Sequence, residues 1–292
     1  MAIVPKFGQI IDNLLRTDPT LAAEKALKKL LQPGRMIPNA QERRYLDTAE
    51  TAWIEVDGVS IKTYAWSRRV DSRTVLLSHG FSMNAATMLN FVQPLVLAGF
   101  KVVTWDHCAH GESGGNRADC RIWMNTIRKM AELHAPLAGI VGFSMGGTAA
   151  VMTLAQHSAL HCPVFCSLNP PLQFDTMLRK FVSFHGCNAE LLTLIPRVAR
   201  EKGMLLPEQL REILPTSDRL ASTKTLIIQD RHDRVASVSE AQWLAGNLAH
   251  CELHFTEQLG HNGALSDRGV VRLATQFITK HEGHVKARAS KL

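Results

Sequence analysis

Residues 138–147 read AGIVGFSMGG, and this stretch decides the fold. Its first four residues are small or apolar and predict a buried strand, whereas residues 145–156 predict a helix. Between them, residues 142–146 fit the Gly-x-Ser-x-Gly pattern of a nucleophile elbow, in which a strand turns at once into a helix. The turn forces Ser144 into a strained conformation, and its small neighbours leave room for it. The Ser144 hydroxyl is therefore expected above the sheet, at the positive end of a helix.

The sequence on both sides alternates between short apolar runs and helical stretches. Two alternating runs, 53–56 and 59–66, flank Asp57-Gly58 and predict a hairpin. Further strands are expected at 74–78, 101–105, 164–168, 225–228 and 252–255, and further helices at 85–97, 121–134, 239–248 and 267–281. This alternation predicts an α/β fold with a mostly parallel central sheet flanked by helices, in which the hairpin supplies antiparallel edge strands.

The alternation stops after Pro170-Pro171. Residues 172–222 carry apolar residues at helical spacing only, and the strand pattern resumes after them. An all-helical insertion of about 50 residues within a sheet domain is longer than an ordinary connection. We therefore predict a core domain from residues 51–171 and 223–282, interrupted by a helical cap or lid at 172–222.

The N-terminal residues 1–50 predict a helical extension. Apolar residues between Phe7 and Leu31 have helical spacing, and Asp18-Pro19 divides them into two short helices, because the residue before a proline avoids the helical conformation. One alternative for these helices is an arm that docks on a membrane surface or a partner. We instead expect them to pack on the main domain. Residues 283–292 predict a basic, solvated C-terminal tail.

Composition excludes several classes of protein. Hydrophobic residues make up 46% of the 292 residues, which is too many for a disordered chain. No apolar run approaches the roughly 20 residues of a membrane-spanning helix. The formal charge is +7, yet the lysines and arginines are spread along the chain without interleaved aromatic residues. We predict neither nucleic-acid binding nor an integral membrane segment, and the oligomeric state stays open.

The six cysteines form no Cys-x-x-Cys pair and lack zinc-ligand spacing. The N-terminus does not read as a secretory signal, so reduced thiols in a cytoplasmic protein are the simplest interpretation. The chain ends in Ser290-Lys291-Leu292, which matches the peroxisomal address and indicates that compartment as the alternative in a eukaryote. No metal site is predicted.

An activated serine needs a base, and the base needs an acid that orients it. The strand at 225–228 leads to two carboxylates, Asp230 and Asp233, and the last strand leads to His261. Both segments follow the carboxyl ends of strands, where open α/β sheets place their sites. The order serine, acid, histidine is the order found after a nucleophile elbow.

Four motifs together give the chain a resemblance to the α/β-hydrolase superfamily over about residues 51–282. These motifs are His79-Gly80-Phe81, Asp106 to Ser113, Gly142 to Gly146, and Asp233 with Gly260-His261. The resemblance implies Ser144 as the nucleophile, Asp233 as the acid and His261 as the base. The position of the acid in relatives favours Asp233 over Asp230, for which we expect a cap on the following turn.

The resemblance also implies an oxyanion hole formed by the backbone N–H groups of Phe81 and Met145. His79 is expected to hold the loop beneath this hole. Relatives commonly carry Asp-x-x-Gly-x-Gly-x-Ser after the fourth strand, and this chain departs from that pattern at Ala109. The departure is expected to alter the loop without touching a triad member.

A serine at the elbow argues against the haloalkane dehalogenases and epoxide hydrolases, whose relatives use aspartate there. We expect an enzyme that hydrolyses carboxylic esters of short or medium acyl chains, with a small-molecule acyl substrate and without cofactor or metal. The alternatives are a thioesterase, amidase, lipase or acyltransferase on the same triad, and a non-catalytic binding protein. The pocket is expected to be apolar, with Phe81, Met83, Phe143, Met145, Leu178 and Phe181 as lining candidates.

Overall fold

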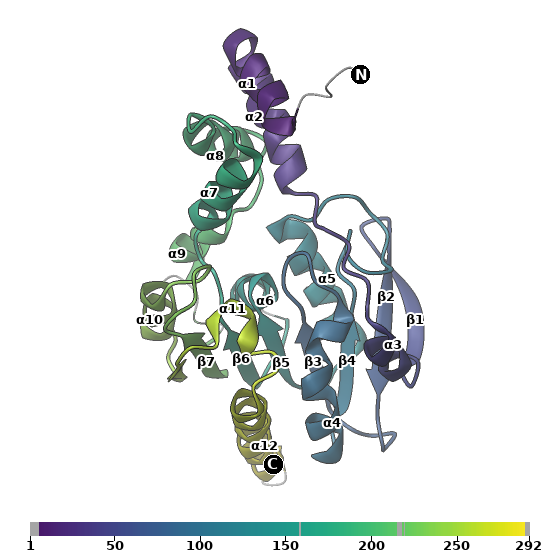
Figure 1. Cartoon of the computed structure of the whole chain (residues 1–292). Coiled ribbons are helices and arrows are strands. Elements are labelled where there is room, and N and C mark those ends of the chain that lie inside the picture. Colours follow the sequence, from purple (N-terminus) through teal and green to yellow (C-terminus); the bar gives the residue numbers. More distant parts are fainter. Residues whose placement is uncertain (1–5, 158, 215–217, 219, 290–292) are drawn as a thin grey trace.

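An eight-stranded sheet forms the centre of the protein (Figure 1). The computed structural model describes residues 6–157, 159–214, 218 and 220–289. The strands are β1 (Glu50–Val56), β2 (Val59–Trp66), β3 (Thr74–Ser78), β4 (Lys101–Trp105), β5 (Leu137–Phe143), β6 (Val164–Leu168), β7 (Lys224–Asp230) and β8 (Cys251–Thr256). Their order is β1-β2-β4-β3-β5-β6-β7-β8; β2 runs antiparallel to β1 and β4, and the other pairs are parallel. The predicted α/β fold and its antiparallel edge are confirmed.

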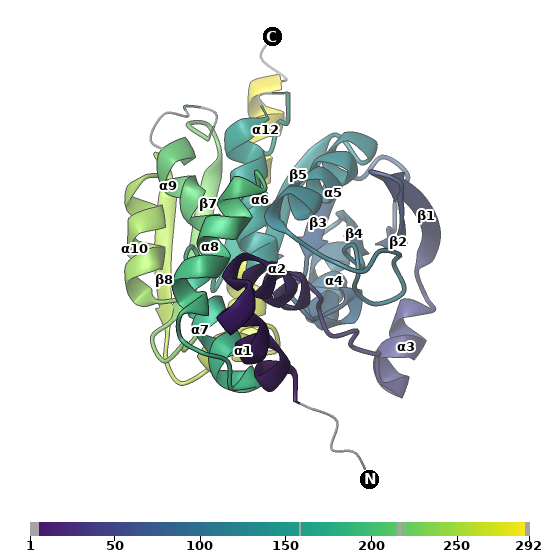
Figure 2. The same ribbon diagram turned by 90° about the horizontal axis from the view of Figure 1, so that it is seen from above.

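Helices cover both faces of the sheet (Figure 2). On one face lie α4 (Leu89–Leu97) and α12 (Arg268–Ala289). On the other face lie α5 (Cys120–Leu133), α6 (Met145–Gln156) and α10 (Val238–Gly246). Each face therefore closes its own apolar core, and β5 is buried along its whole length. Burial on both faces explains why the parallel strands read as continuous apolar runs.

Side-chain caps place the starts of several helices. Asp18, Asp119 and Ser237 each accept a hydrogen bond from a backbone N–H in the first turn of α2, α5 and α10, respectively. These oxygens satisfy donors that would otherwise have no partner at a helix N-terminus. In α2 (Pro19–Leu30) a proline follows the cap, at the position where its missing N–H costs nothing.

The first two helices of the inserted segment and the N-terminal helices form one helical unit above the sheet (Figure 1). The helices of the insertion are α7 (Phe174–His185), α8 (Leu191–Glu201), η2 (Pro207–Gln209) and α9 (Leu210–Ile213). A third apolar core joins α7 and α8 to α1 (Phe7–Thr17) and α2. The expectation that the N-terminal helices pack on the main domain was wrong, because their apolar stripes face the cap helices instead.

Three short elements complete the chain: α3 (Ala40–Leu46), η1 (Ala85–Met88) and α11 (Gly260–Gly263). Helix α12 continues beyond residue 282, so the backbone of 283–289 is helical. The C-terminal tripeptide 290–292 lies outside the described residues. Within the described part of the chain, no helix is long and apolar enough to cross a membrane.

Candidate active site

Ser144 lies at the junction of β5 and α6, where the sequence predicts an elbow. Its backbone has φ 51° and ψ −126°, a conformation that residues with side chains rarely adopt. The turn needs glycines around it. A Cβ atom on Gly142 would lie 2.5 Å from Cα of Gly147, and one on Gly146 would lie 2.4 Å from the carbonyl oxygen of His79. Backbone packing therefore holds Ser144 at the N-terminus of α6, where the helix dipole favours negative charge.

The imidazole of His261 lies between Ser144 and Asp233. Its Nε2 atom is 2.9 Å from the Ser144 Oγ, and its Nδ1 atom is 2.7 Å from Oδ2 of Asp233. A carboxylate can only accept, so Nδ1 carries the proton and Nε2 is left to accept from the hydroxyl. The second oxygen of Asp233 accepts from the N–H groups of Val235 at 2.6 Å and Ala236 at 3.1 Å. The Asp233 side chain is fully buried, which shields this chain of hydrogen bonds from bulk water.

Asp230 lies at the end of β7 and holds the loop that carries the imidazole. Its carboxylate accepts from the N–H groups of Leu259 and Gly260, each at 3.0 Å, and from the hydroxyl of Thr256 at 2.9 Å. Burial raises the pKa of Asp230, but these hydrogen bonds outweigh burial and the pKa is lowered overall. The expected turn cap is also present, because the N–H of His232 donates to Asp230 at 2.9 Å.

A second buried residue, Asn169, fixes the same loop. Its Nδ2 donates to the carbonyl of His261 at 2.7 Å, and its Oδ1 accepts from the N–H of Asp230 at 2.9 Å. Sequence reasoning missed Asn169. The available signal was a polar residue placed between the apolar strand β6 and Pro170-Pro171.

The two predicted oxyanion donors lie on different elements. Phe81 follows β3, and Met145 is the first residue of α6. Both residues line the cavity at Ser144. Within the described part of the chain, no backbone carbonyl accepts a hydrogen bond from either N–H. An oxyanion hole requires backbone donors of this kind that point at the developing charge, and these two N–H groups are the candidates for it.

Three buried histidines support the loop that contains Phe81. The Nδ1 of His79 bonds the carbonyl of Gly80 at 2.8 Å, and its Nε2 accepts from the N–H of His107 at 3.0 Å. His110 accepts from the N–H of Ser82 at 3.0 Å. Burial lowers the pKa of His79 and His107 well below the usual value and that of His110 to about 4. The rings are therefore neutral at pH 7 and able to accept these bonds.

Ala109 has φ 66°, the left-handed conformation in which relatives commonly carry glycine. The loop after β4 therefore keeps that turn, at a cost of about 1–2 kcal/mol for a residue with a side chain. Asp106 ties this loop to the loop after β3. Its carboxylate accepts from the N–H of Ala85 at 2.8 Å and from the N–H of Glu112 at 2.9 Å.

A cavity of about 380 Å³ lies at Ser144, beneath the cap. Four expected residues line it, namely Phe81, Met83, Phe143 and Met145. The two expected cap residues, Leu178 and Phe181, do not. They pack in the core between the cap and the N-terminal helices, where the Phe181 ring lies 6.1 Å from that of Phe7. The cap instead presents Phe174 and Met177 to the cavity, because the other apolar side of α7 is covered by α1.

Both apolar and polar residues line the cavity. Phe81, Met145, Phe174 and Met177 also line a narrower, almost wholly apolar gap that continues towards Trp123. Besides Ser144 and His261, the polar residues of the cavity wall are Ser82, Gln173, Thr176, Lys180 and Asn262. Within the described residues no group of three or more side chains suits a metal ion.

A known protein family and two relatives match parts of this chain. A family model described as serine aminopeptidase, S33, matches residues 71–215. The chain is 33% identical to a monoacylglycerol lipase of Mycolicibacterium smegmatis over 108 residues; this alignment covers 34% of this chain and 39% of the relative. The chain is 28% identical to protein YqkD of Bacillus subtilis over 128 residues; this alignment covers 41% of this chain and 42% of the relative. The chain thus spans about two fifths of the length of these relatives.

Solved structures share the fold at lower identity. The Pyrococcus furiosus esterase Pf2001 superposes with a TM-score of 0.63 at 19% identity, over 86% of this chain and 98% of that chain. The esterase EaEST of Exiguobacterium antarcticum superposes with a TM-score of 0.59 at 17% identity, over 78% of this chain and 99% of that chain. At such identities the likeness concerns the fold.

Proposed function

We propose that the chain is an α/β-hydrolase that hydrolyses carboxylic esters of short or medium acyl chains; its fold and the family model over residues 71–215 support this proposal. Ser144 is the proposed nucleophile, His261 the base and Asp233 the acid. The observation that carries the proposal is the unbroken chain of hydrogen bonds from the Ser144 hydroxyl through His261 to Asp233.

In the proposed acylation step, Nε2 of His261 takes the hydroxyl proton while Oγ of Ser144 attacks the acyl carbon. The tetrahedral intermediate collapses, the bond to the leaving oxygen breaks, and His261 returns the proton to the departing alcohol. Asp233 orients the ring and stabilises its charged form, as the buried acid does in other triads.

The proposed oxyanion donors are the N–H groups of Phe81 and Met145. Each such donor contributes about 3–4 kcal/mol to transition-state stability in comparable sites. In the second step a water molecule gives a proton to His261 and attacks the acyl carbon. Collapse of that intermediate releases the acid and regenerates the Ser144 hydroxyl.

Cavity size favours small acyl groups. Its 380 Å³ lies near the lower end of the range of small-molecule sites, which is about 300–1,000 Å³. A second candidate is a lipase-type activity on longer acyl chains. It is supported by the apolar gap beyond Met177 and by the monoacylglycerol lipase among the relatives.

A panel of p-nitrophenyl esters from acetate to dodecanoate, run with matched thioesters and anilides, tests the proposal. We expect ester turnover with an optimum at short or medium chains. Ser144→Ala should lower kcat/KM by about 10⁴-fold or more, as loss of the nucleophile does in other triads. Ser183→Ala, an exposed serine of α7 that does not line the cavity, is the matched control. Turnover retained in Ser144→Ala would contradict the assignment.

The cysteines support a cytoplasmic location as part of the same proposal. All six cysteines are free in the structure, as expected in a reducing compartment. Microscopy of a fusion that leaves the C-terminal Ser290-Lys291-Leu292 intact would separate the cytoplasm from the peroxisome.

A further inference from the structure

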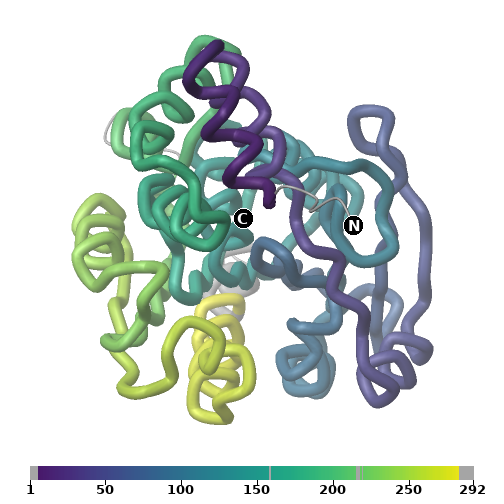
Figure 3. The backbone as a smooth tube through the Cα atoms, turned by 45° about the horizontal axis from the view of Figure 1, so that its top comes forward, coloured from purple at the N-terminus to yellow at the C-terminus, as the bar shows by residue number. Residues whose placement is uncertain are grey.

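The segment between α2 and α3 crosses the end of the sheet at which Ser144 lies. We call this segment, residues 32–39, the strap. Figure 3 shows it descending between the loop after β3 and the loop after β4. These two loops contain the proposed oxyanion donor Phe81 and the buried histidine His110, so the strap lies where both can be held at once.

Two hydrogen bonds join the strap to the loop after β3. The N–H of Gly34 donates to Oγ of Ser82 at 3.0 Å. The Nδ2 atom of Asn84 donates to the carbonyl of Met36 at 3.0 Å. Ser82 directly follows Phe81 and has φ 59°, a conformation that favours glycine, so the bonds to it hold a strained turn.

Arg35 bonds the strap to the loop after β4. One guanidinium nitrogen donates to the carbonyls of Gly111 at 2.8 Å and Ser113 at 2.7 Å, with a longer contact of 3.4 Å to that of His110. The other terminal nitrogen donates to the carbonyl of Gly115 at 2.8 Å. The guanidinium is planar and presents its donors in a fixed fork, so one side chain gathers four carbonyls that converge on it.

The two loops are themselves joined beneath the strap. His110 sits within the loop that Arg35 holds, and its Nε2 accepts from the N–H of Ser82. Arg35 also helps to lower the pKa of His110, although burial is the larger cause. Arg35 therefore acts on the peptide next to Phe81 through two routes, one through Gly34 and Ser82 and one through His110.

We propose that Arg35 is a positioning residue for the oxyanion hole, acting by holding the loop that carries the Phe81 N–H. The strap also supplies a wall of the substrate cavity, because Met36 lines it. This inference rests on the proposed function. It assigns a catalytic consequence to a segment that lies outside the triad and outside the cap insertion.

Arg35→Gln is the direct test, with kcat expressed per active site titrated by a fluorophosphonate. We expect kcat for a short p-nitrophenyl ester to fall about tenfold with KM changed less than about twofold, because a displaced donor weakens the transition state more than substrate binding. A trifluoromethyl ketone that forms a tetrahedral adduct should bind more weakly by the same factor. Arg35→Lys should recover part of kcat, since an ammonium group reaches fewer of the carbonyls.

Ser82→Ala removes the acceptor of the Gly34 N–H and provides a second variant if Arg35→Gln folds poorly. It should lower kcat in the same direction. Arg44→Gln, at an exposed arginine of α3, is the matched control and should leave kcat unchanged. Unchanged kcat in folded Arg35→Gln, or a change in KM alone, would overturn the inference and leave the proposed function standing. A wild-type protein that neither turns over esters nor reacts with the fluorophosphonate would overturn both.

Discussion

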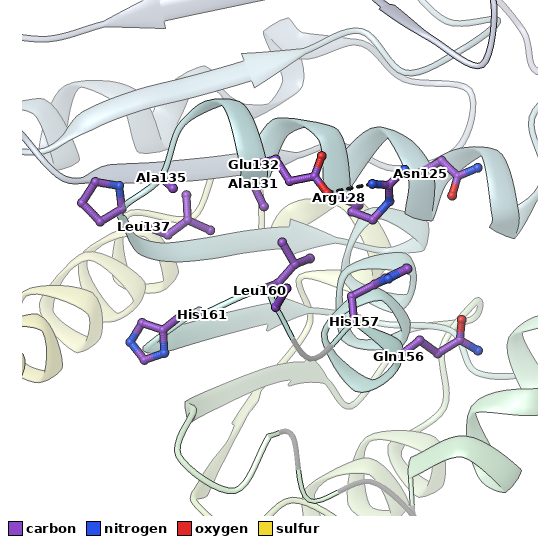
Figure 4. A pocket seen from close by; sticks show the side chains of 12 residues that line it. Asn125, Arg128, Ala131, Glu132, Ala135, Leu137, Gln156, His157, Leu160 and His161 are labelled. Atoms are coloured by element: carbon purple, nitrogen blue, oxygen red, sulfur yellow. Dashed lines mark hydrogen bonds and ion pairs between the residues drawn. The ribbon is translucent and has the colours of Figure 1, made fainter.

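Two cavities lie at opposite ends of the sheet, and the larger one lacks the serine–histidine–aspartate chain. The cavity at Ser144 measures about 380 Å³, whereas the hollow between α5 and the end of α6 measures about 640 Å³. Figure 4 shows the second hollow, with Leu137 at the start of β5 and an ion pair between Arg128 and Glu132. Volume therefore does not identify the site in this protein.

The two cavities differ in which ends of β5 and α6 they meet. Strand β5 begins at Leu137 in the larger hollow and leads to Ser144 at the other cavity. Helix α6 begins at Met145 and ends at Gln156, which lines the larger hollow. The cavity at Ser144 therefore meets the positive end of α6, and the larger hollow meets its negative end. A negative charge that develops on an acyl oxygen is stabilised only at the first.

The largest expected effect distinguishes the two aspartates at the Ser144 end of the sheet. Asp233→Asn should lower kcat/KM by about 10⁴-fold, because the amide no longer selects the tautomer of His261 that leaves Nε2 as the acceptor. Asp230→Asn should cost less activity, since Asp230 holds the loop but does not bond the ring. Ester kinetics for both variants measures the difference, and a larger loss of kcat/KM in Asp230→Asn would reverse the assignment.

Buried histidines at the Ser144 end of the sheet should make the protein less stable in acid. The pKa of His110 in the folded protein is lowered to about 4. In the unfolded chain this histidine takes up a proton below about pH 6.5, whereas in the folded protein it stays neutral down to about pH 4. Stability should therefore fall as pH falls through that window, by about 2 kcal/mol for His110 alone between pH 7 and pH 5. His79 and His107, whose pKa values are also lowered by burial, should add to the loss.

Urea unfolding at the two pH values measures this effect in the wild type and in His110→Gln. The variant should show a smaller pH dependence. His134→Gln measures the contribution of a histidine between α5 and β5. Burial also lowers the pKa of His134 to about 4, so this variant should reduce the pH dependence as well. A pH dependence that His134→Gln removes and His110→Gln leaves intact would locate acid lability away from the site.

A substitution at Met177 tests whether the apolar gap extends the cavity at Ser144. Met177→Ala should open the passage towards Trp123 and raise the ratio of kcat/KM for octanoyl over acetyl esters by about tenfold, within the range that a few methylene contacts provide. Phe184→Ala, at an 86% exposed residue of the same helix, is the control. An unchanged ratio would mean that the acyl chain does not enter the gap.

The smallest effect is expected in the larger hollow. Glu132→Ala removes the ion pair with Arg128, which measures 2.7 Å and is partly exposed. Exposed pairs four residues apart on a helix contribute about 0.3–0.5 kcal/mol, so the free energy of unfolding should change by no more than that. Ester kcat/KM should stay within about twofold of the wild type. A loss of activity beyond that would break the functional separation of the two ends.

The sequence alone determined the sheet, the helical insertion between β6 and β7, and the elbow at Ser144. Each of these leaves a local mark. A strand buried on both faces is continuously apolar, and a strand-to-helix turn needs small residues such as Gly142 and Gly146. The first turn of a helix is preceded by an N-capping residue such as Asp119. The resemblance to the superfamily also led to Asp233 and His261, which lie next to each other in the structure.

Only the tertiary structure decided which side chains meet across the site. Asn169 and Arg35 act through backbone groups of other loops, and a bond to a carbonyl leaves no mark on the residue that supplies it. The same holds for the cap: the apolar side of α7 looked like a pocket wall, yet Leu178 and Phe181 pack beside α1 and α2. Periodicity shows that a helix face is buried, and the partner that buries it depends on contacts between residues far apart in the chain.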